Sequence, residues 1–166
     1  MYLEEFFDYK NQLMKDILSN KKIVELLCTD SPPENARDLA YTQVFPYEYI
    51  PETIEHGKTY ICFDVDVQRG PYGKTLLDPM IYIWVFTHKS LLRLPEGGVR
   101  VDAIVHEIAK AIDGSRCYGL GELNIYSVKR FSPQIDYQGK VLSFSATDFN
   151  RLSPTGKPIP SNRKTG

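Results

Sequence analysis

Two aspartates separated by a single residue are the part of the sequence that most resembles a metal site. Asp64 and Asp66 lie in a stretch where apolar and polar residues alternate, which places both carboxylates on one face of a predicted strand. Carboxylates at this spacing can hold a divalent ion for phosphodiester hydrolysis. Further ligands would be needed, and only Asp78 and Glu122 lie near predicted strand ends. A solvated sheet face also explains the pair, so a small metal-dependent nuclease is the alternative function.

Two further motifs begin like ligand sites and then depart from them. His106-Glu107 opens the zinc-protease pattern His-Glu-x-x-His, but Lys110 stands where the second histidine is required. Residues 70–75 end in Gly-Lys-Thr like a phosphate loop, yet their two glycines are too close together and the segment joins two predicted strands. We therefore expect His106 on a helix surface without a ligand role, and a hairpin tip that binds no nucleotide.

The cysteines and serines do not form a recognisable catalytic pattern. Cys28, Cys62 and Cys117 are widely spaced and lack the short paired spacing of zinc or redox motifs. We therefore expect these cysteines to be buried and to pack like small hydrophobic residues. No serine lies in a nucleophile elbow, and no cysteine shares a local signature with a histidine. The sequence therefore predicts a protein that is not an enzyme and needs no cofactor.

Composition and charge predict a folded protein that binds neither membranes nor specific nucleic acid. Hydrophobic residues make up 42% and charged residues 25% of the chain, which is typical of globular domains. The formal net charge of -1 gives no positive field to attract phosphates or anionic lipid. The acidic start, Met1 to Glu5, is unlike a secretory signal, and no apolar run is long enough to span a bilayer.

Hydrophobic periodicity predicts an α+β fold, with a helix packed across an antiparallel sheet of about four strands. Residues 80–86 are apolar on both faces and indicate a central strand. Trp84 lies in this run, and its truncation to alanine is expected to cost about 3 to 5 kcal/mol. The predicted elements are helices over 3–18 and 23–27, strands over 60–68 and 80–86, a helix over 101–112, and strands over 123–131 and 141–149 joined by a loop over 133–139. The apolar stripe of the first helix includes Phe7, the second helix follows a cap signal at Ser19-Asn20, and the third closes at Gly114.

One α+β domain is expected over 1–150, followed by an extended basic arm over 151–166. Within the domain, residues 29–57 lack sustained periodicity but are rich in aromatic residues, which predicts a long loop that makes contacts. The arm contains three prolines, four basic residues and no acidic ones. Such a segment gains little by folding on its own domain, so we expect it to dock on a neighbouring subunit. Its charges could pair there with Asp64, Asp66 or acidic groups of the N-terminal helix.

This layout resembles the tail terminator and neck (head-tail joining) proteins of tailed bacteriophages. The resemblance rests on the order of elements, since no diagnostic motif is present. It implies a ring, commonly of six subunits, that caps the tail tube, stops its polymerisation and joins the tail to the head connector. The segments that carry the resemblance are 60–68, 80–86, 101–112, 123–131 and 141–149, about half of the chain.

The resemblance also implies partners, a location and candidate interface residues. The partners would be copies of the chain, the tube protein and neck or connector proteins. The location would be the virion, after assembly in the host cytoplasm, and DNA could pass through the ring. A monomeric adaptor that holds one partner through the aromatic loop is a third possibility. The expected interface residues are Tyr47, Tyr49, Tyr72, Lys74, Arg151, Arg163 and Lys164.

Overall fold

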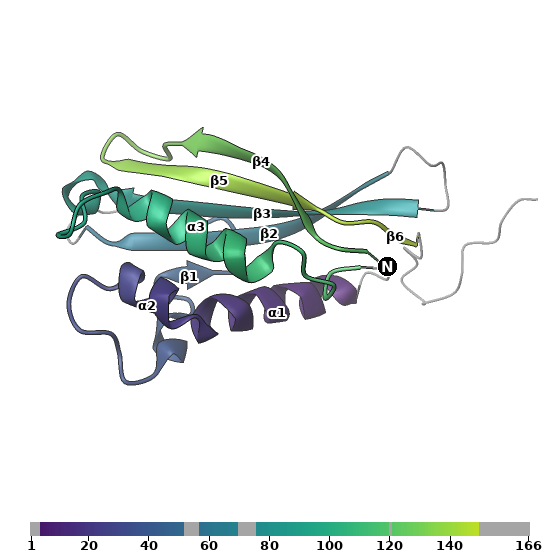
Figure 1. Ribbon diagram of the computed structural model, residues 1–166, viewed down its shortest axis with the longest axis horizontal. Helices are drawn as coiled ribbons and strands as arrows, with labels where there is room; N and C mark the ends of the chain where they lie inside the picture. The colour runs from purple at the N-terminus through teal and green to yellow at the C-terminus, as the bar shows by residue number, and fades with distance from the viewer. Residues whose placement is uncertain (1–3, 52–56, 70–75, 120, 150–166) are drawn as a thin grey trace, which may run out of the picture.

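One mixed β-sheet with helices on one of its faces organises the chain (Figure 1). The computed structural model describes residues 4–51, 57–69, 76–119 and 121–149. The predicted hairpin tip at 70–75 and the basic arm at 151–166 lie outside the described residues. The predicted α+β fold class is confirmed.

Helix α1 (Glu5–Ser19) turns one narrow stripe toward the core. Tyr9, Leu13 and Ile17 follow one another at intervals of four residues and are all buried, as expected for an amphipathic helix. Phe7 was expected in the same stripe, but its side chain is 74% exposed. Its position is offset by two from Tyr9, which turns it roughly 200° around the helix axis at 3.6 residues per turn.

Helix α2 (Lys21–Leu27) begins at the residue that the sequence indicates as a cap. The side-chain oxygen of Asn20 accepts hydrogen bonds from the backbone nitrogens of Lys22 at 3.1 Å and Ile23 at 3.3 Å. These donors have no partner inside the helix, so the cap satisfies two groups that the helix leaves free. Ile23, Val24 and Leu27 then bury the short helix against the core.

Replacing Asn20 with alanine is expected to lower the free energy of unfolding by about 1 kcal/mol, because both amide hydrogens lose their acceptor. Urea denaturation measures the loss. Asn11 is an exposed asparagine inside α1, so Asn11→Ala serves as the matched control and should be neutral or slightly stabilising. Equal effects of the two changes would contradict the assigned cap.

The sheet is built around two long antiparallel strands, as the sequence predicts. Strand β2 (Thr59–Arg69) pairs along its whole length with β3 (Leu76–His88), and β3 is central because β5 (Tyr137–Ser145) pairs on its other side. β4 (Asn124–Phe131) forms the outer edge next to β5. The strand order is β1-β2-β3-β5-β4.

The prediction of about four strands was too low. Two further strands of two residues each extend the sheet: β1 (Val44–Phe45) pairs parallel with β2 at one edge, and β6 (Asp148–Phe149) pairs with the start of β3. Neither is long enough to show a two-residue alternation in the sequence. The strand expected over 141–149 instead runs from Tyr137 to Ser145, so the loop before it is shorter than expected.

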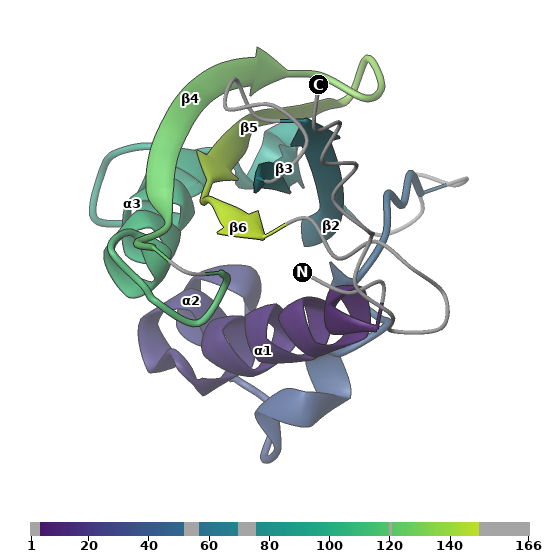
Figure 2. The same ribbon diagram turned by 90° about the vertical axis from the view of Figure 1, so that its right-hand side faces the viewer.

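Helix α3 (Arg100–Ile112) lies across the sheet and closes the core together with α1 and α2 (Figures 1 and 2). Its expected end is confirmed, because Gly114 takes a φ of 78°, which a glycine adopts without strain. The buried hydroxyl of Tyr118 donates to Asp16 at 2.9 Å and ties the segment after α3 to α1. The inward residues of the two central strands and α3 are Ile61, Phe63, Val65, Ile81, Ile83, Val85, Val101, Ile104, Ile108 and Ile112.

An aromatic cluster covers one end of the opposite sheet face. Phe45 and Tyr49 lie on this end, with ring centroids 4.1 Å apart in a stacked arrangement. As a result Tyr60 and Cys62 are buried, although both lie on the face of β2 away from the helices. The long loop therefore makes contacts, as its aromatic content predicts, and these contacts are within the chain. Two short 3-10 helices, Ala36–Leu39 and Lys89–Leu91, complete the described elements.

Candidate functional site

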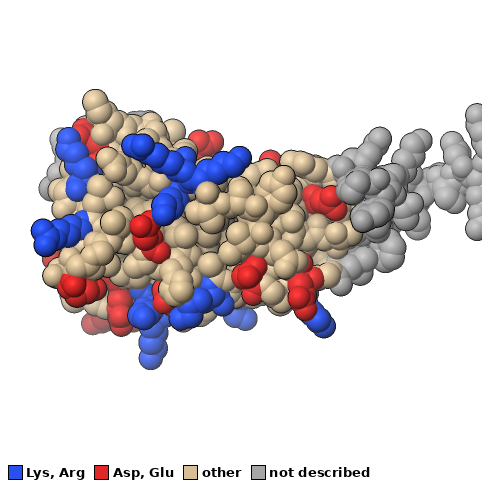
Figure 3. All heavy atoms as spheres, turned by 45° about the horizontal axis from the view of Figure 1, so that its top comes forward, with Lys and Arg blue, Asp and Glu red and all other residues tan. Residues whose placement is uncertain are grey.

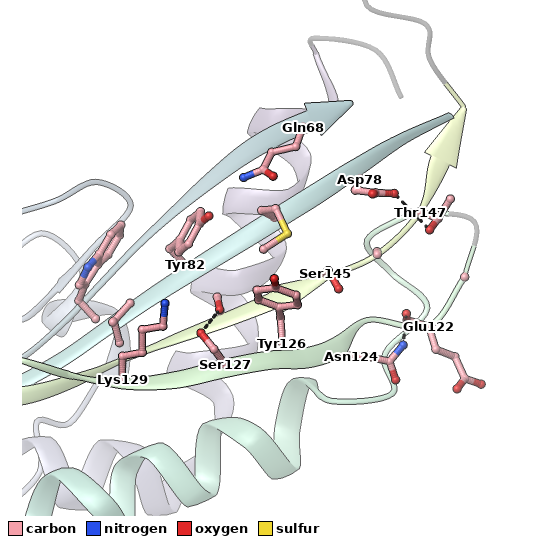
Figure 4. A pocket seen from close by; sticks show the side chains of 16 residues that line it. Gln68, Asp78, Tyr82, Glu122, Asn124, Tyr126, Ser127, Lys129, Ser145 and Thr147 are labelled. Carbon is pink, nitrogen blue, oxygen red and sulfur yellow. Dashed lines mark hydrogen bonds between the residues drawn. The ribbon is translucent and has the colours of Figure 1, made fainter. Parts of the chain in front are cut away.

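A groove of about 760 Å3 lies on the sheet face opposite the helices, beyond the aromatic cluster (Figure 4). Strand β4 curls over one side of this face (Figure 2). The strand register explains which side chains reach the groove, because residues directly opposite each other share a face. Asp64, Asp66 and Gln68 of β2 lie opposite Tyr82, Met80 and Asp78 of β3.

Aromatic rings line the middle of the groove. Tyr82 and Trp84 lie two residues apart on β3 and stack with ring centroids 6.0 Å apart. Tyr126 of β4 stands on the same side of the sheet and is 71% exposed (Figure 4). Trp84 also contacts the buried aromatic cluster, so its ring marks the boundary between covered and open sheet. The face therefore offers large flat apolar surfaces to solvent.

Polar groups surround the rings. The hydroxyls of Ser127 and Ser143 are 2.7 Å apart across β4 and β5, and the hydroxyl of Thr147 donates to Asp78 at 3.5 Å (Figure 4). Lys129 is the basic residue among those that line the groove, whereas Asp78 and Glu122 are its acidic ones. On the face shown in Figure 3, most Lys and Arg side chains gather toward the end opposite the grey atoms.

The two aspartates of the predicted metal pair have different surroundings. Asp64 forms an ion pair with Lys10 of α1, in which the ammonium nitrogen lies 2.6 Å from a carboxylate oxygen of Asp64. Asp66 is exposed, and Asp78 lies further along the same face. Within the described ranges, no group of three or more His, Cys, Asp or Glu side chains could hold a metal ion. The lysine next to Asp64 already supplies the positive charge that a metal ion would supply.

Of the predicted interface residues, the structure describes Tyr47 and Tyr49. Tyr47 is 45% exposed, and its ring lies 5.6 Å from that of Phe45. Tyr49 stacks on Phe45 and lies 5.7 Å from Tyr60, so most of its ring packs within the chain. Tyr72, Lys74, Arg151, Arg163 and Lys164 lie outside the described residues. Tyr82, Trp84 and Tyr126 were not expected in a shared site, since their approach depends on a strand order that periodicity does not give.

The remaining chemical candidates from the sequence lie outside the groove. His106 is exposed on α3, as predicted, while its neighbour Glu107 is buried and pairs with Lys22 at 3.7 Å and Lys110 at 3.4 Å. The expectation of buried cysteines holds for Cys62, holds only in part for the half-buried Cys28, and is wrong for Cys117, which is exposed. Burial raises the pKa of the Cys62 thiol from its ordinary value of 9.0 to about 12.

The protein is expected to lose stability as pH rises above about 9, because unfolding then lets the Cys62 thiol ionise. A raised folded-state pKa means that the stabilisation is complete below pH 9 and declines as pH approaches 12. Burial also raises the pKa of Tyr60 to about 12, which adds to the loss at the upper end. Denaturation midpoints between pH 8 and 11 measure the slope. Cys62→Ala should give a shallower slope, and an unchanged slope would contradict the thiol's contribution.

The described residues define an α+β protein whose three α-helices cover one face of a single sheet and whose other face carries an open groove. Residues 20–146 match the YomW family, so the chain belongs to this family, which is phage-derived. A comparison with curated proteins gives no match. None of the helices in the described part of the chain has the length and apolar character required to cross a bilayer.

Proposed function

We propose that the chain is a structural component of a phage particle, acting as a tail terminator or another ring subunit of the neck. In this role it caps the tail tube, stops its polymerisation and joins the tail to the head connector. Its partners are copies of itself, the tube protein and neck proteins. The virion is its final location, after assembly in the host cytoplasm. Membership in a phage-derived family supports the setting.

The open aromatic groove is the observation that carries this proposal. The three α-helices of the described residues pack on the other face, so none of them lies above Tyr82, Trp84 or Tyr126. Tyrosine and tryptophan are enriched at the centres of protein interfaces because they combine a large apolar area with a polar group. A groove of this composition is suited to contact with another protein.

A second surface for assembly lies at the outer edge of the sheet. β4 has no strand beyond it among the described residues, and Ile125 and Val128 are 40% and 45% exposed along it. An edge strand presents unpaired backbone groups and can bind another chain. Subunits of a ring contact each other through two different surfaces, and we propose the groove and the β4 edge for these contacts.

The nuclease alternative is less favoured by the geometry. Lys10 holds Asp64 at 2.6 Å, and a metal ion would have to displace this ammonium group before Asp64 and Asp66 could act together. A ring subunit does not require Asp64 and Asp66 to bind a metal ion. Metal-dependent cleavage of DNA by the purified chain, abolished in Asp64→Ala, would favour the enzyme over the structural role.

The direct test is to image phage particles that carry the chain and particles from which its gene is deleted. We expect its density as a ring at the neck end of the tail, and tubes of abnormal length or unjoined heads without it. A groove variant, Tyr82→Ser with Tyr126→Ser, should show the same defect if partners bind there. Lys21→Ser, at an exposed position of α2, serves as its control. Normal, fully joined particles in the deletion would overturn the proposal.

A further inference from the structure

The aromatic groove has the chemistry of a receptor for a proline-rich peptide. Proline-rich segments bind in grooves lined by aromatic rings, because their extended backbone is already ordered and loses little entropy. Tyr82 and Trp84 stack side by side along β3, and Tyr126 stands exposed on β4 on the same side of the sheet. Tyr82 and Trp84 therefore offer two flat surfaces along β3, and Tyr126 offers a third across the groove.

The acidic end of the groove selects a basic peptide, since the lining cation Lys129 lies level with Trp84 at the other end. Asp78 lines one end of the groove, and Asp66 lies on the same face, opposite Met80. No ion pair joins either carboxylate to another residue in the described part of the chain, whereas Glu122 is already held by Arg116 at 2.7 Å. Two unneutralised carboxylates beside aromatic rings attract a segment that carries both prolines and cations.

The chain itself contains a segment of this chemistry. Residues 151–166 include Pro154, Pro158 and Pro160, with Ile159 between the last two. Lys157 directly precedes this proline pair, and further basic residues follow it. The segment has no acidic residue, so its whole charge is available to carboxylates on another surface. The prolines and Ile159 can pack against the aromatic rings, while the flanking basic residues can pair with the carboxylates of Asp66 and Asp78.

The direction of β6 favours the groove of a neighbouring copy. Leu76 pairs with Phe149 and Leu77 with Asp148, so β6 runs toward the start of β3 and away from Asp78 and Trp84. The chain beyond Phe149 must reverse to enter its own groove. Its 17 residues, 150–166, can span up to roughly 50 Å when extended at about 3.1 Å per residue. The groove from Asp78 to Trp84 needs about 20 Å of this reach.

We propose that the groove on the open sheet face binds residues 151–166 of a neighbouring copy of this chain. Pro158, Ile159 and Pro160 lie against Tyr82, Trp84 and Tyr126, and the basic residues pair with Asp66 and Asp78. The proposal rests on the proposed function in that ring assembly brings the neighbouring copy into place. Exchange of tails between subunits would link each member of a ring to the next.

Trp84 allows the proposal to be tested on the intact protein, because it is the chain's single tryptophan. Acrylamide quenching of its fluorescence measures access to the groove, and light scattering measures the mass in solution. In the full chain we expect low quenching together with self-association. Reversal of three tail charges, Lys157→Glu with Arg163→Glu and Lys164→Glu, should raise quenching several-fold and shift the mass toward the monomer.

Two matched variants separate tail docking from a general charge effect. Reversal of three exposed charges elsewhere, Lys15→Glu with Lys21→Glu and Arg37→Glu, should leave quenching and mass unchanged. Adding Asp66→Lys and Asp78→Lys to the reversed tail should restore both protection of Trp84 and self-association, because the charges are complementary again. A merely structural role of the tail would not give this restoration.

Two results would overturn the proposal. Quenching of Trp84 that is the same in the full chain and in the charge-reversed tail would show that the tail does not reach the groove. Protection that persists at dilutions where the chain is monomeric would place the tail in its own groove and refute exchange between copies. These measurements use purified protein, so a chain absent from the phage neck would refute the proposed function without altering them.

Discussion

Replacing Gly139 with valine is expected to lower the free energy of unfolding by at least about 3 kcal/mol. Gly139 lies in β5 between Phe86 of β3 and Phe131 of β4, which are its partners in the strand register. The two phenylalanine rings meet edge to face, with centroids 5.8 Å apart, beside the position that has no side chain. A Cβ at residue 139 would collide with the carbonyl oxygen of Val85 and lie 2.6 Å from the Cβ of Phe86.

Gly121 supplies the matched control for this change. A Cβ added there meets no atom within 4 Å, so Gly121→Ala should alter stability by no more than about 0.5 kcal/mol. Guanidinium denaturation of the two variants and the parent chain measures the difference. A Gly139→Val protein as stable as the parent would mean that β5 does not pair with β3 and β4 in the register found here.

Gly139 also shows where sequence reasoning reaches its limit. A glycine near Pro133 and Asp136 favours a loop, and residues 133–139 were expected as one. The structure places Gly139 inside a strand, because two aromatic rings from neighbouring strands need the space above it. One of the two rings belongs to Phe86, which lies more than fifty positions away along the chain. Local periodicity therefore carries no information about this requirement.

Elements whose signals are local were predicted correctly. The cap at Asn20, the end of α3 at Gly114 and the pairing of β2 with β3 each depend on neighbouring residues or on one short connection. The two-residue strands β1 and β6 depend on partners elsewhere in the sheet: β1 was not predicted, and β6 was predicted only as the end of one continuous strand over 141–149. Local chemistry therefore determined the helices and the hairpin, whereas the sheet edges depended on tertiary contacts.

The candidate groove follows the same rule. Asp64 and Asp66 were correctly placed on one face of a strand, but their alternation could not reveal that Lys10 of α1 reaches Asp64. Tyr82 and Trp84 were expected in a strand that is apolar on both sides. Which of those sides remains open depends on where the three helices pack. The aromatic groove could be identified only after the helices had been assigned to one face.

Truncation of Phe63 to alanine is expected to cost about 3 to 5 kcal/mol, the largest loss among the single side chains considered. Phe63 is completely buried, and it lies on the helix-covered face of β2 in the main core. Removal of its ring leaves a cavity that the surrounding strands and helices cannot fill without strain. Thermal or chemical denaturation measures the loss. The exposed counterpart is Phe7, and Phe7→Ala should be nearly neutral.

The same experiment revises the expectation for Trp84. Its place in a central strand is confirmed, and α3 covers that strand on the face of Ile81 and Ile83. The Trp84 side chain points to the other face, where it is only partly buried beside the groove. Folding removes less apolar surface from water at this position. Trp84→Ala should therefore lower the free energy of unfolding clearly less than Phe63→Ala does, despite the larger ring of Trp84. An equal or greater loss at Trp84 would mean that the sheet face at the groove is covered in the folded chain.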